Sequence, residues 1–71
     1  MITLEQISQQ IALAIRQSTL TQTEIAKQLG VKQPTVSDYV HGKALPALDT
    51  LANLCKILDL DANELLCLSG I

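Results

Sequence analysis

Two short helical segments separated by only three residues constrain this chain more than any other feature of its sequence. The first is predicted over residues 22–29, because the stretch TQTE supplies a capping box and apolar residues follow at helical spacing. Gly30 ends it, since glycine readily adopts the left-handed conformation that closes many helices. The second is predicted over residues 33–41, with Pro34 in its first turn, where a missing N–H costs nothing. Helices this short depend on packing against other elements.

Three further amphipathic helices are predicted from the rest of the chain. They are expected over about residues 4–18, 48–58 and 62–68. Thr3 with Gln6 forms a capping box before the first, and Asp61 with Glu64 is expected to cap the last. No alternation typical of β-strands occurs. The sequence therefore predicts an all-α fold, a compact bundle of five short helices that forms one domain over residues 1–71.

The composition indicates an aliphatic core. Hydrophobic residues make up 48% of the 71 residues, yet Tyr39 is the sole aromatic side chain. Leucine, isoleucine, valine and alanine must therefore fill the interior, which favours helices over a small β-barrel. A chain of this size buries only about 60% of the surface that it exposes when unfolded. Its many apolar residues thus suggest that a partner chain covers some of them.

The charges are distributed unevenly along the chain. The net charge is −2, which argues against a strongly basic nucleic-acid-binding surface. Residues 16–43, however, carry four basic and two acidic side chains, whereas residues 44–71 carry one basic and four acidic ones. The pair of short helices thus lies in the cationic part of the chain.

Membrane insertion and metal binding are not expected. No apolar run approaches the roughly 20 residues that span a bilayer, and no leader pattern opens the chain, so a soluble cytoplasmic protein is expected. Cys55 and Cys67 form no CxxC motif, and His41 is remote from both in sequence. We expect no metal and no cofactor, and two free thiols. A redox role for Cys67 remains an alternative.

From Leu20 to Leu66 the chain resembles the Cro/C1-type (XRE) family of phage repressors and bacterial regulators. The resemblance rests on LTQTEIAKQLGVKQPTVSDYVHGK and LPALDTLANLCKILDLDANELL. The family pattern comprises a Leu-Thr-Gln opening, Ile-Ala and Leu-Gly-Val through the turn, a Thr-Val-Ser triplet, a glycine stop and a final Glu-Leu-Leu. It implies a lambda-repressor-like DNA-binding domain whose second and third helices form a helix-turn-helix.

Eight residues occupy positions that the resemblance assigns to contact with double-stranded DNA: Gln22, Lys32, Gln33, Pro34, Thr35, Ser37, Asp38 and Lys43. Gln22 would donate its amide to a phosphate at the positive end of a helix. Gln33 would pair with an adenine edge, Pro34 would touch a thymine methyl, and Asp38 would accept from a cytosine amino group. The lysines and the threonine would contact phosphates, which fix the register without reading sequence.

These residues also have simpler interpretations. Gln22 and Lys27 would then be solvated surface residues, and Pro34 would only start its helix. Asp38 would repel the DNA backbone and read nothing. His41, which stands where the family has an asparagine, suits a surface or capping role as well as a phosphate contact.

The chain departs from the family pattern in informative places. Many members join the first and third helices by an Arg–Glu ion pair, and Ile15 and Val40 occupy those positions here. A joint apolar replacement is usually neutral or stabilising, whereas a single change would leave a charge unpaired. Ala47 stands where the family often has a serine N-cap, a loss of about 1 kcal/mol.

The resemblance implies a sequence-specific transcriptional regulator that binds an inverted repeat as a homodimer, its recognition helices about 34 Å apart. The expected dimer surface comprises Leu65, Leu66, Cys67, Leu68 and Ile71, with Leu65 or Leu66 belonging to the core instead. No small-molecule effector is expected in a chain of this length. The alternative is a protein-interaction module of the same fold, antirepressor-like or antitoxin-like. An enzyme is not expected, because no nucleophile, base and orienting group occur together.

Overall fold

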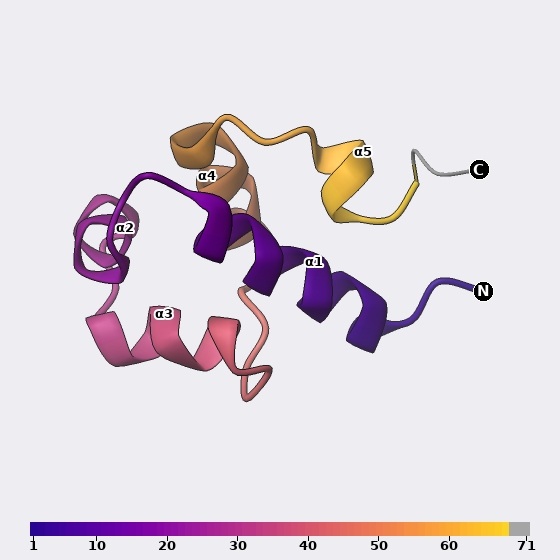
Figure 1. Cartoon of the computed structure of the whole chain (residues 1–71), viewed down its shortest axis with the longest axis horizontal. Helices are drawn as coiled ribbons and strands as arrows, with labels where there is room; N and C mark the ends of the chain where they lie inside the picture. The colour runs from indigo at the N-terminus through magenta and orange to yellow at the C-terminus, as the bar shows by residue number, and fades with distance from the viewer. Residues whose placement is uncertain (69–71) are drawn as a thin grey trace.

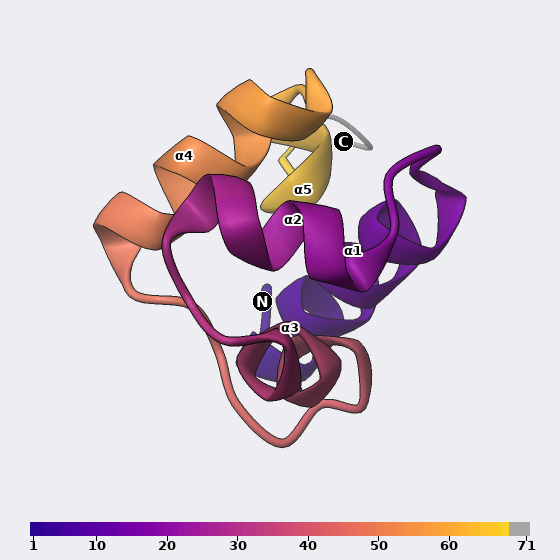
Figure 2. The ribbon, with the colours of Figure 1, turned by 90° about the vertical axis from the view of Figure 1, so that its left-hand side faces the viewer.

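Five α-helices make up the computed structural model, which describes residues 1–68. They are α1 (Leu4–Gln17), α2 (Gln22–Leu29), α3 (Gln33–Val40), α4 (Leu48–Leu58) and α5 (Ala62–Leu65), and no strand occurs in that range. Helix α1 crosses the middle of the bundle and packs on both α3 and α5, while α2 packs on α3 and α4 (Figure 1). A view from the side places α3 at the edge of the bundle opposite α4 and α5 (Figure 2). The predicted all-α bundle is confirmed.

Both predicted capping boxes form at helix starts. The N–H of Gln6 donates to the hydroxyl of Thr3 at 3.2 Å, and the N–H of Thr3 donates to Oε1 of Gln6 at 2.8 Å. At α2 the N–H of Glu24 donates to the hydroxyl of Thr21 at 3.1 Å, and the N–H of Thr21 donates to the carboxylate at 3.0 Å. Each box satisfies two amides that have no partner within the helix.

Four helices are followed, within one or two residues, by a residue in the left-handed conformation. These residues are Gly30 at φ 75°, Gly42 at φ 72°, Asp59 at φ 54° and Cys67 at φ 64°. After α2, for example, the N–H of Val31 donates to the carbonyl of Ala26 at 3.0 Å, which gives that carbonyl a partner at the helix end. Glycine adopts this backbone without strain at the first two ends, whereas aspartate and cysteine do so at some cost.

Helix α5 is shorter than predicted. The expectation was residues 62–68, but the helix ends at Leu65 and the chain turns at Cys67. The N–H of Leu68 donates to the carbonyl of Asn63 at 2.7 Å, a bond that closes the helix instead of extending it. The cap also differs, because the carboxylate of Asp61 accepts from the N–H of Asn63 at 2.9 Å. Helix α1 stops one residue before its predicted end and so does α3, while α2 and α4 have the predicted bounds.

An aliphatic core joins the five helices. Its buried members are Ile11, Ile15, Ile25, Ala26, Val36, Tyr39, Val40, Leu54 and Leu65. Ile15 and Val40 are both buried there, as expected for an apolar pair in place of an ion pair. Leu4 and Leu48 stay exposed, since each is the first residue of its helix. Ala47 provides no side-chain hydrogen bond at the start of α4, and this expected loss of a cap is confirmed.

Candidate nucleic-acid interface

The first turn of α3 is exposed to solvent, and no acidic side chain there neutralises the positive end of the helix dipole. Lys32 is the N-cap residue and makes no side-chain capping bond, and the first turn contains no acidic residue. Gln33 and Pro34 follow it, and both are exposed. Helices α1 and α2, by contrast, begin with a capping box and an acidic side chain. The dipole of α3 therefore favours an external anion at this end.

Gln33 is held by a side chain from the neighbouring helix. Its amide nitrogen donates to the side-chain oxygen of Gln22 at 2.8 Å, and the two residues are the first of α3 and α2. The two glutamines were expected to have separate roles, and this bond was not predicted. They lie eleven positions apart, so no local spacing rule could have found it. The free amide of Gln22 and the carbonyl of Gln33 remain available to a ligand.

The later residues of α3 are less exposed than the first ones. Thr35, Ser37 and Asp38 are half-buried along the helix, whereas Lys43 beyond its end is fully exposed. The Ser37 hydroxyl lies 3.3 Å from Nδ1 of His41, which also lies 2.8 Å from the carbonyl oxygen of Ser37. A carbonyl accepts, so Nδ1 of His41 is the donor in that bond. His41 thus has the capping role that was one of its two expected interpretations.

The acidic side chain in the first turn of α2 belongs to the capping box. The carboxylate of Glu24 accepts from the N–H of Thr21 at 3.0 Å, and this backbone bond, followed by the interaction with the Thr21 side chain, holds the pKa of the carboxyl below the ordinary value. Its charge therefore serves the start of α2, where the helix dipole also favours an anion.

Comparison with protein families identifies this arrangement. The family model described as helix-turn-helix matches residues 11–65, which include α2, the turn and α3. The chain belongs to the XRE family of helix-turn-helix proteins. The family predicted from its sequence is thereby confirmed. No solved structure matches the chain.

Two kinds of curated relative are similar to this helix-turn-helix chain. The ImmF control region 10 kDa protein of Bacillus phage phi105 is 38% identical over 50 residues, which cover 70% of this chain and 56% of that protein. Antitoxin HigA1 of Mycobacterium tuberculosis is 45% identical over 40 residues, which cover 56% of this chain and 27% of that protein. The matched part thus spans about half of the phage relative and about a quarter of the antitoxin.

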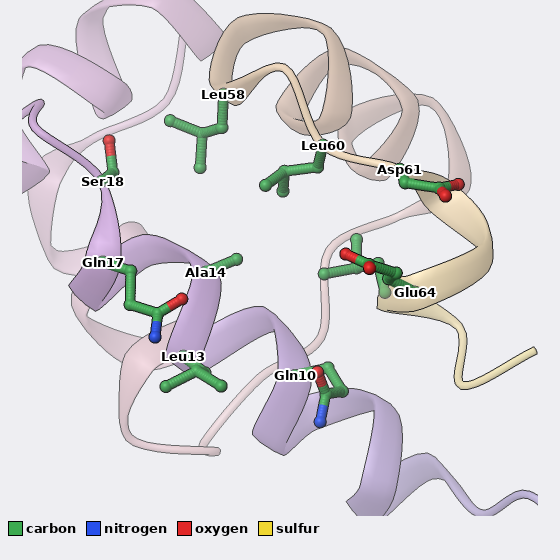
Figure 3. Close-up of a pocket in the computed structure, with 10 residues that line it drawn as sticks. Gln10, Leu13, Ala14, Gln17, Ser18, Leu58, Leu60, Asp61 and Glu64 are labelled. Atoms are coloured by element: carbon green, nitrogen blue, oxygen red, sulfur yellow. The ribbon is translucent and has the colours of Figure 1, made fainter. Parts of the chain in front are cut away.

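A groove lies on the other side of the helix-turn-helix domain, between α1 and the region of α4 and α5 (Figure 3). Its volume is about 200 Å³, and its lining includes Leu13 of α1 with Leu58 and Leu60. Asp61 and Glu64 line its α5 side, where Figure 3 shows their carboxylates. Carboxylates repel phosphates, so this groove is unsuited to a nucleic acid. The apolar part of its lining is partly exposed, since Leu13 is 44% exposed.

The described residues of the expected dimer surface differ in how far they are buried. Leu65 is 4% exposed and belongs to the core, as one of the two adjacent leucines was expected to. Leu66 and Cys67 are half-buried, and Leu68 is 48% exposed. Ile71 lies outside the described residues. The apolar surface left available near α5 is therefore smaller than the sequence suggested.

Both cysteines are free and half-buried. Burial raises the pKa of the Cys55 thiol, which favours its less reactive protonated form. Within residues 1–68 no three His, Cys, Asp or Glu side chains come together to hold a metal ion. None of the described helices has the length and apolar character needed to cross a membrane.

Proposed function

We propose that the protein is a sequence-specific DNA-binding transcriptional regulator that inserts α3 into the major groove. The observation that carries this proposal is the hydrogen bond between Gln33 and Gln22 at the exposed start of an uncapped α3. A fixed glutamine at the tip of a helix suits the bidentate reading of an adenine edge. The family to which the chain belongs supports the same function.

The residues around this pair have complementary roles in the proposal. Gln22, whose side-chain oxygen accepts from Gln33, donates its free NH₂ group to a phosphate and keeps Gln33 oriented. Pro34, next to it and exposed, touches a thymine methyl group. Asp38 accepts from a cytosine amino group farther along the helix. Ser37 completes the inner part of this base-reading surface, although its hydroxyl is shared with His41.

Phosphate contacts surround this reading surface. Lys32, Thr35 and Lys43 provide them, the two lysines through exposed ammonium groups. Such contacts fix the register of α3 in the groove and weaken as salt concentration rises. The modest number of cations predicts a shallower dependence on salt than that of a strongly basic repressor.

A homodimer on an inverted repeat completes the proposal. One short helix reads only a few base pairs, so two protomers about 34 Å apart are needed for useful specificity. Leu66, Cys67, Leu68 and Ile71 form the pairing surface, and Leu65 supports it from the core. The phage control region relative is compatible with a regulator of this kind.

Selection of bound fragments from random double-stranded DNA tests the proposal directly. We expect one enriched motif with two-fold symmetry and half-sites one helical turn apart. The double variant Gln22→Ala with Gln33→Ala should lose retention of the selected fragment while keeping its helical circular dichroism. Absence of any enriched motif with the wild-type protein would contradict the proposal.

A protein-interaction module is the second candidate, and the acidic groove favours it. Leu13, Leu58 and Leu60 offer an apolar floor there, and the relative named as an antitoxin is compatible with such a role. In that case the partner is a protein with cationic and apolar side chains. A wild-type protein that retains no genomic fragment, together with a Leu13→Glu variant that loses a partner bound by the wild type, would favour this candidate.

A further inference from the structure

A polar recess, separate from the groove, lies between α1 and the carboxyl end of α3, away from Gln22. Its volume is about 210 Å³, and it is lined by Ser8, Gln9, Ala12, Arg16, Val40, His41 and Gly42. Arg16 and His41 are exposed at its edge. The two elements meet closely here, since a side-chain carbon on Gly42 would lie 3.7 Å from the hydroxyl oxygen of Ser8. Arg16 was not assigned to the DNA surface from the sequence, whereas a phosphate contact was one interpretation of His41.

The side chains of this recess are mainly hydrogen-bond donors. The guanidinium of Arg16 presents five N–H groups in a fork that matches a phosphate, and Gln9 and Ser8 add an amide and a hydroxyl. His41 uses Nδ1 on the carbonyl of Ser37, which leaves Nε2 for another partner. Glu5 is the acidic residue of the adjoining groove, which shares Ser8, Gln9 and Gly42, and Lys43 follows directly in the chain. The recess thus suits an anion.

The length of α3 indicates which anion the recess would bind. Eight residues at about 1.5 Å each make a helix about 12 Å long, which is close to the width of the major groove. When Gln33 reaches the bases, the opposite end of α3 lies near the strand that borders the groove. We infer that Arg16, at the edge of the recess beside His41, holds a phosphodiester of that strand, on the side away from the phosphate contact of Gln22. This inference rests on the proposed DNA binding and adds a cation from α1.

The salt dependence of binding to the selected operator tests this assignment. Between about 50 and 200 mM salt, Arg16→Gln should reduce the slope of log K against log salt by about 0.9 per protomer, since one phosphate contact is lost. It should weaken operator and scrambled duplex by the same factor. Arg16→Lys should keep the slope, because it keeps the charge. Lys56→Gln, an exposed cation on α4, should behave as wild type.

The outcomes separate this inference from the proposed function. A wild-type protein that binds its operator, with an Arg16→Gln variant of unchanged slope and affinity, overturns the phosphate contact alone. A wild-type protein that binds no DNA overturns the proposed function and this inference with it. A loss of discrimination between operator and scrambled duplex in Arg16→Gln would also contradict the inference, because a backbone contact carries no sequence information.

Discussion

The side-chain amide of Gln33 donates to the side-chain oxygen of Gln22 across 2.8 Å, which joins the exposed first residue of α3 to the half-buried first residue of α2. A glutamine side chain otherwise loses considerable rotamer freedom when it binds a base edge. Holding it before binding reduces that loss, so in the proposed function Gln22 contributes to recognition even where it touches no base. The two residues should therefore act as one unit.

A double-mutant cycle on this pair measures that coupling. Gln33→Ala should lower operator affinity by about 1–3 kcal/mol and relax the preference at one base pair. Gln22→Ala should weaken binding as well, and the two losses should not add, with an interaction energy of at least about 0.5 kcal/mol. Fluorescence anisotropy on the selected duplex gives all four affinities. Gln10→Ala, on the groove side of α1, serves as control and should bind as wild type.

The core leucine of α4 should dominate local stability. Leu54 is 0% exposed, so Leu54→Ala should cost about 2–5 kcal/mol and lower the melting temperature by more than about 8 °C. Leu48, on the same helix, is 86% exposed, and Leu48→Ala should change stability by less than about 0.5 kcal/mol. Thermal unfolding followed by circular dichroism compares the two. Equal losses would mean that the assignment of core and surface along α4 is wrong.

Two helix ends should respond to substitution with opposite signs. Gly30 has φ 75° with no atom within 4 Å of an added side-chain carbon, so Gly30→Ala should cost about 1–2 kcal/mol through backbone strain alone. Asp59 has φ 54°, and Asp59→Gly should stabilise the protein by up to about 1 kcal/mol. Chemical denaturation measures both free energies of unfolding. A stabilising Gly30→Ala would show that the left-handed end of α2 is not required.

The capping box of α2 should make stability depend on pH. The bonds that Glu24 makes to Thr21 lower its pKa from the ordinary 4.5. The contribution of Glu24 to the free energy of unfolding is therefore complete above pH 4.5 and is lost as the pH falls through the lower pKa of the folded state. Glu24→Gln removes the charge but keeps an acceptor. The difference in melting temperature between wild type and Glu24→Gln should therefore be largest near neutral pH and vanish at strongly acidic pH. A difference that is independent of pH would contradict this.

The pairing surface and the groove can be distinguished by matched substitutions. Leu68 is 48% exposed near α5, and Leu68→Glu should shift the proposed dimer to monomer because it would place a charge in the proposed apolar interface. Leu13, 44% exposed in the groove, is the control, and Leu13→Glu should leave the dimer intact. Sedimentation equilibrium over a range of concentrations reports the outcome. Dissociation by Leu13→Glu with an intact Leu68→Glu dimer would place the interface in the groove.

Helix boundaries were predictable where the signal lies within a few residues. Helix α2 has its predicted bounds, because the Thr21 capping box and Gly30 act on the adjacent turns, and the bounds of α4 follow from its apolar periodicity. The prediction was wrong for α5, where a cysteine takes the left-handed position that usually indicates glycine. The expected DNA-contacting residues could be assigned only from the family resemblance.

The five helices, their order and the family could be predicted from the sequence, since capping boxes and apolar periodicity are local properties. The packing of the helices fixes which apolar residues are buried, so that Leu54 and Leu65 lie in the core while Leu48 is exposed. It also brought Gln22 to Gln33 and Arg16 to the recess beside His41. These residues are separated in the sequence, and only the angles at which the helices cross bring their side chains together.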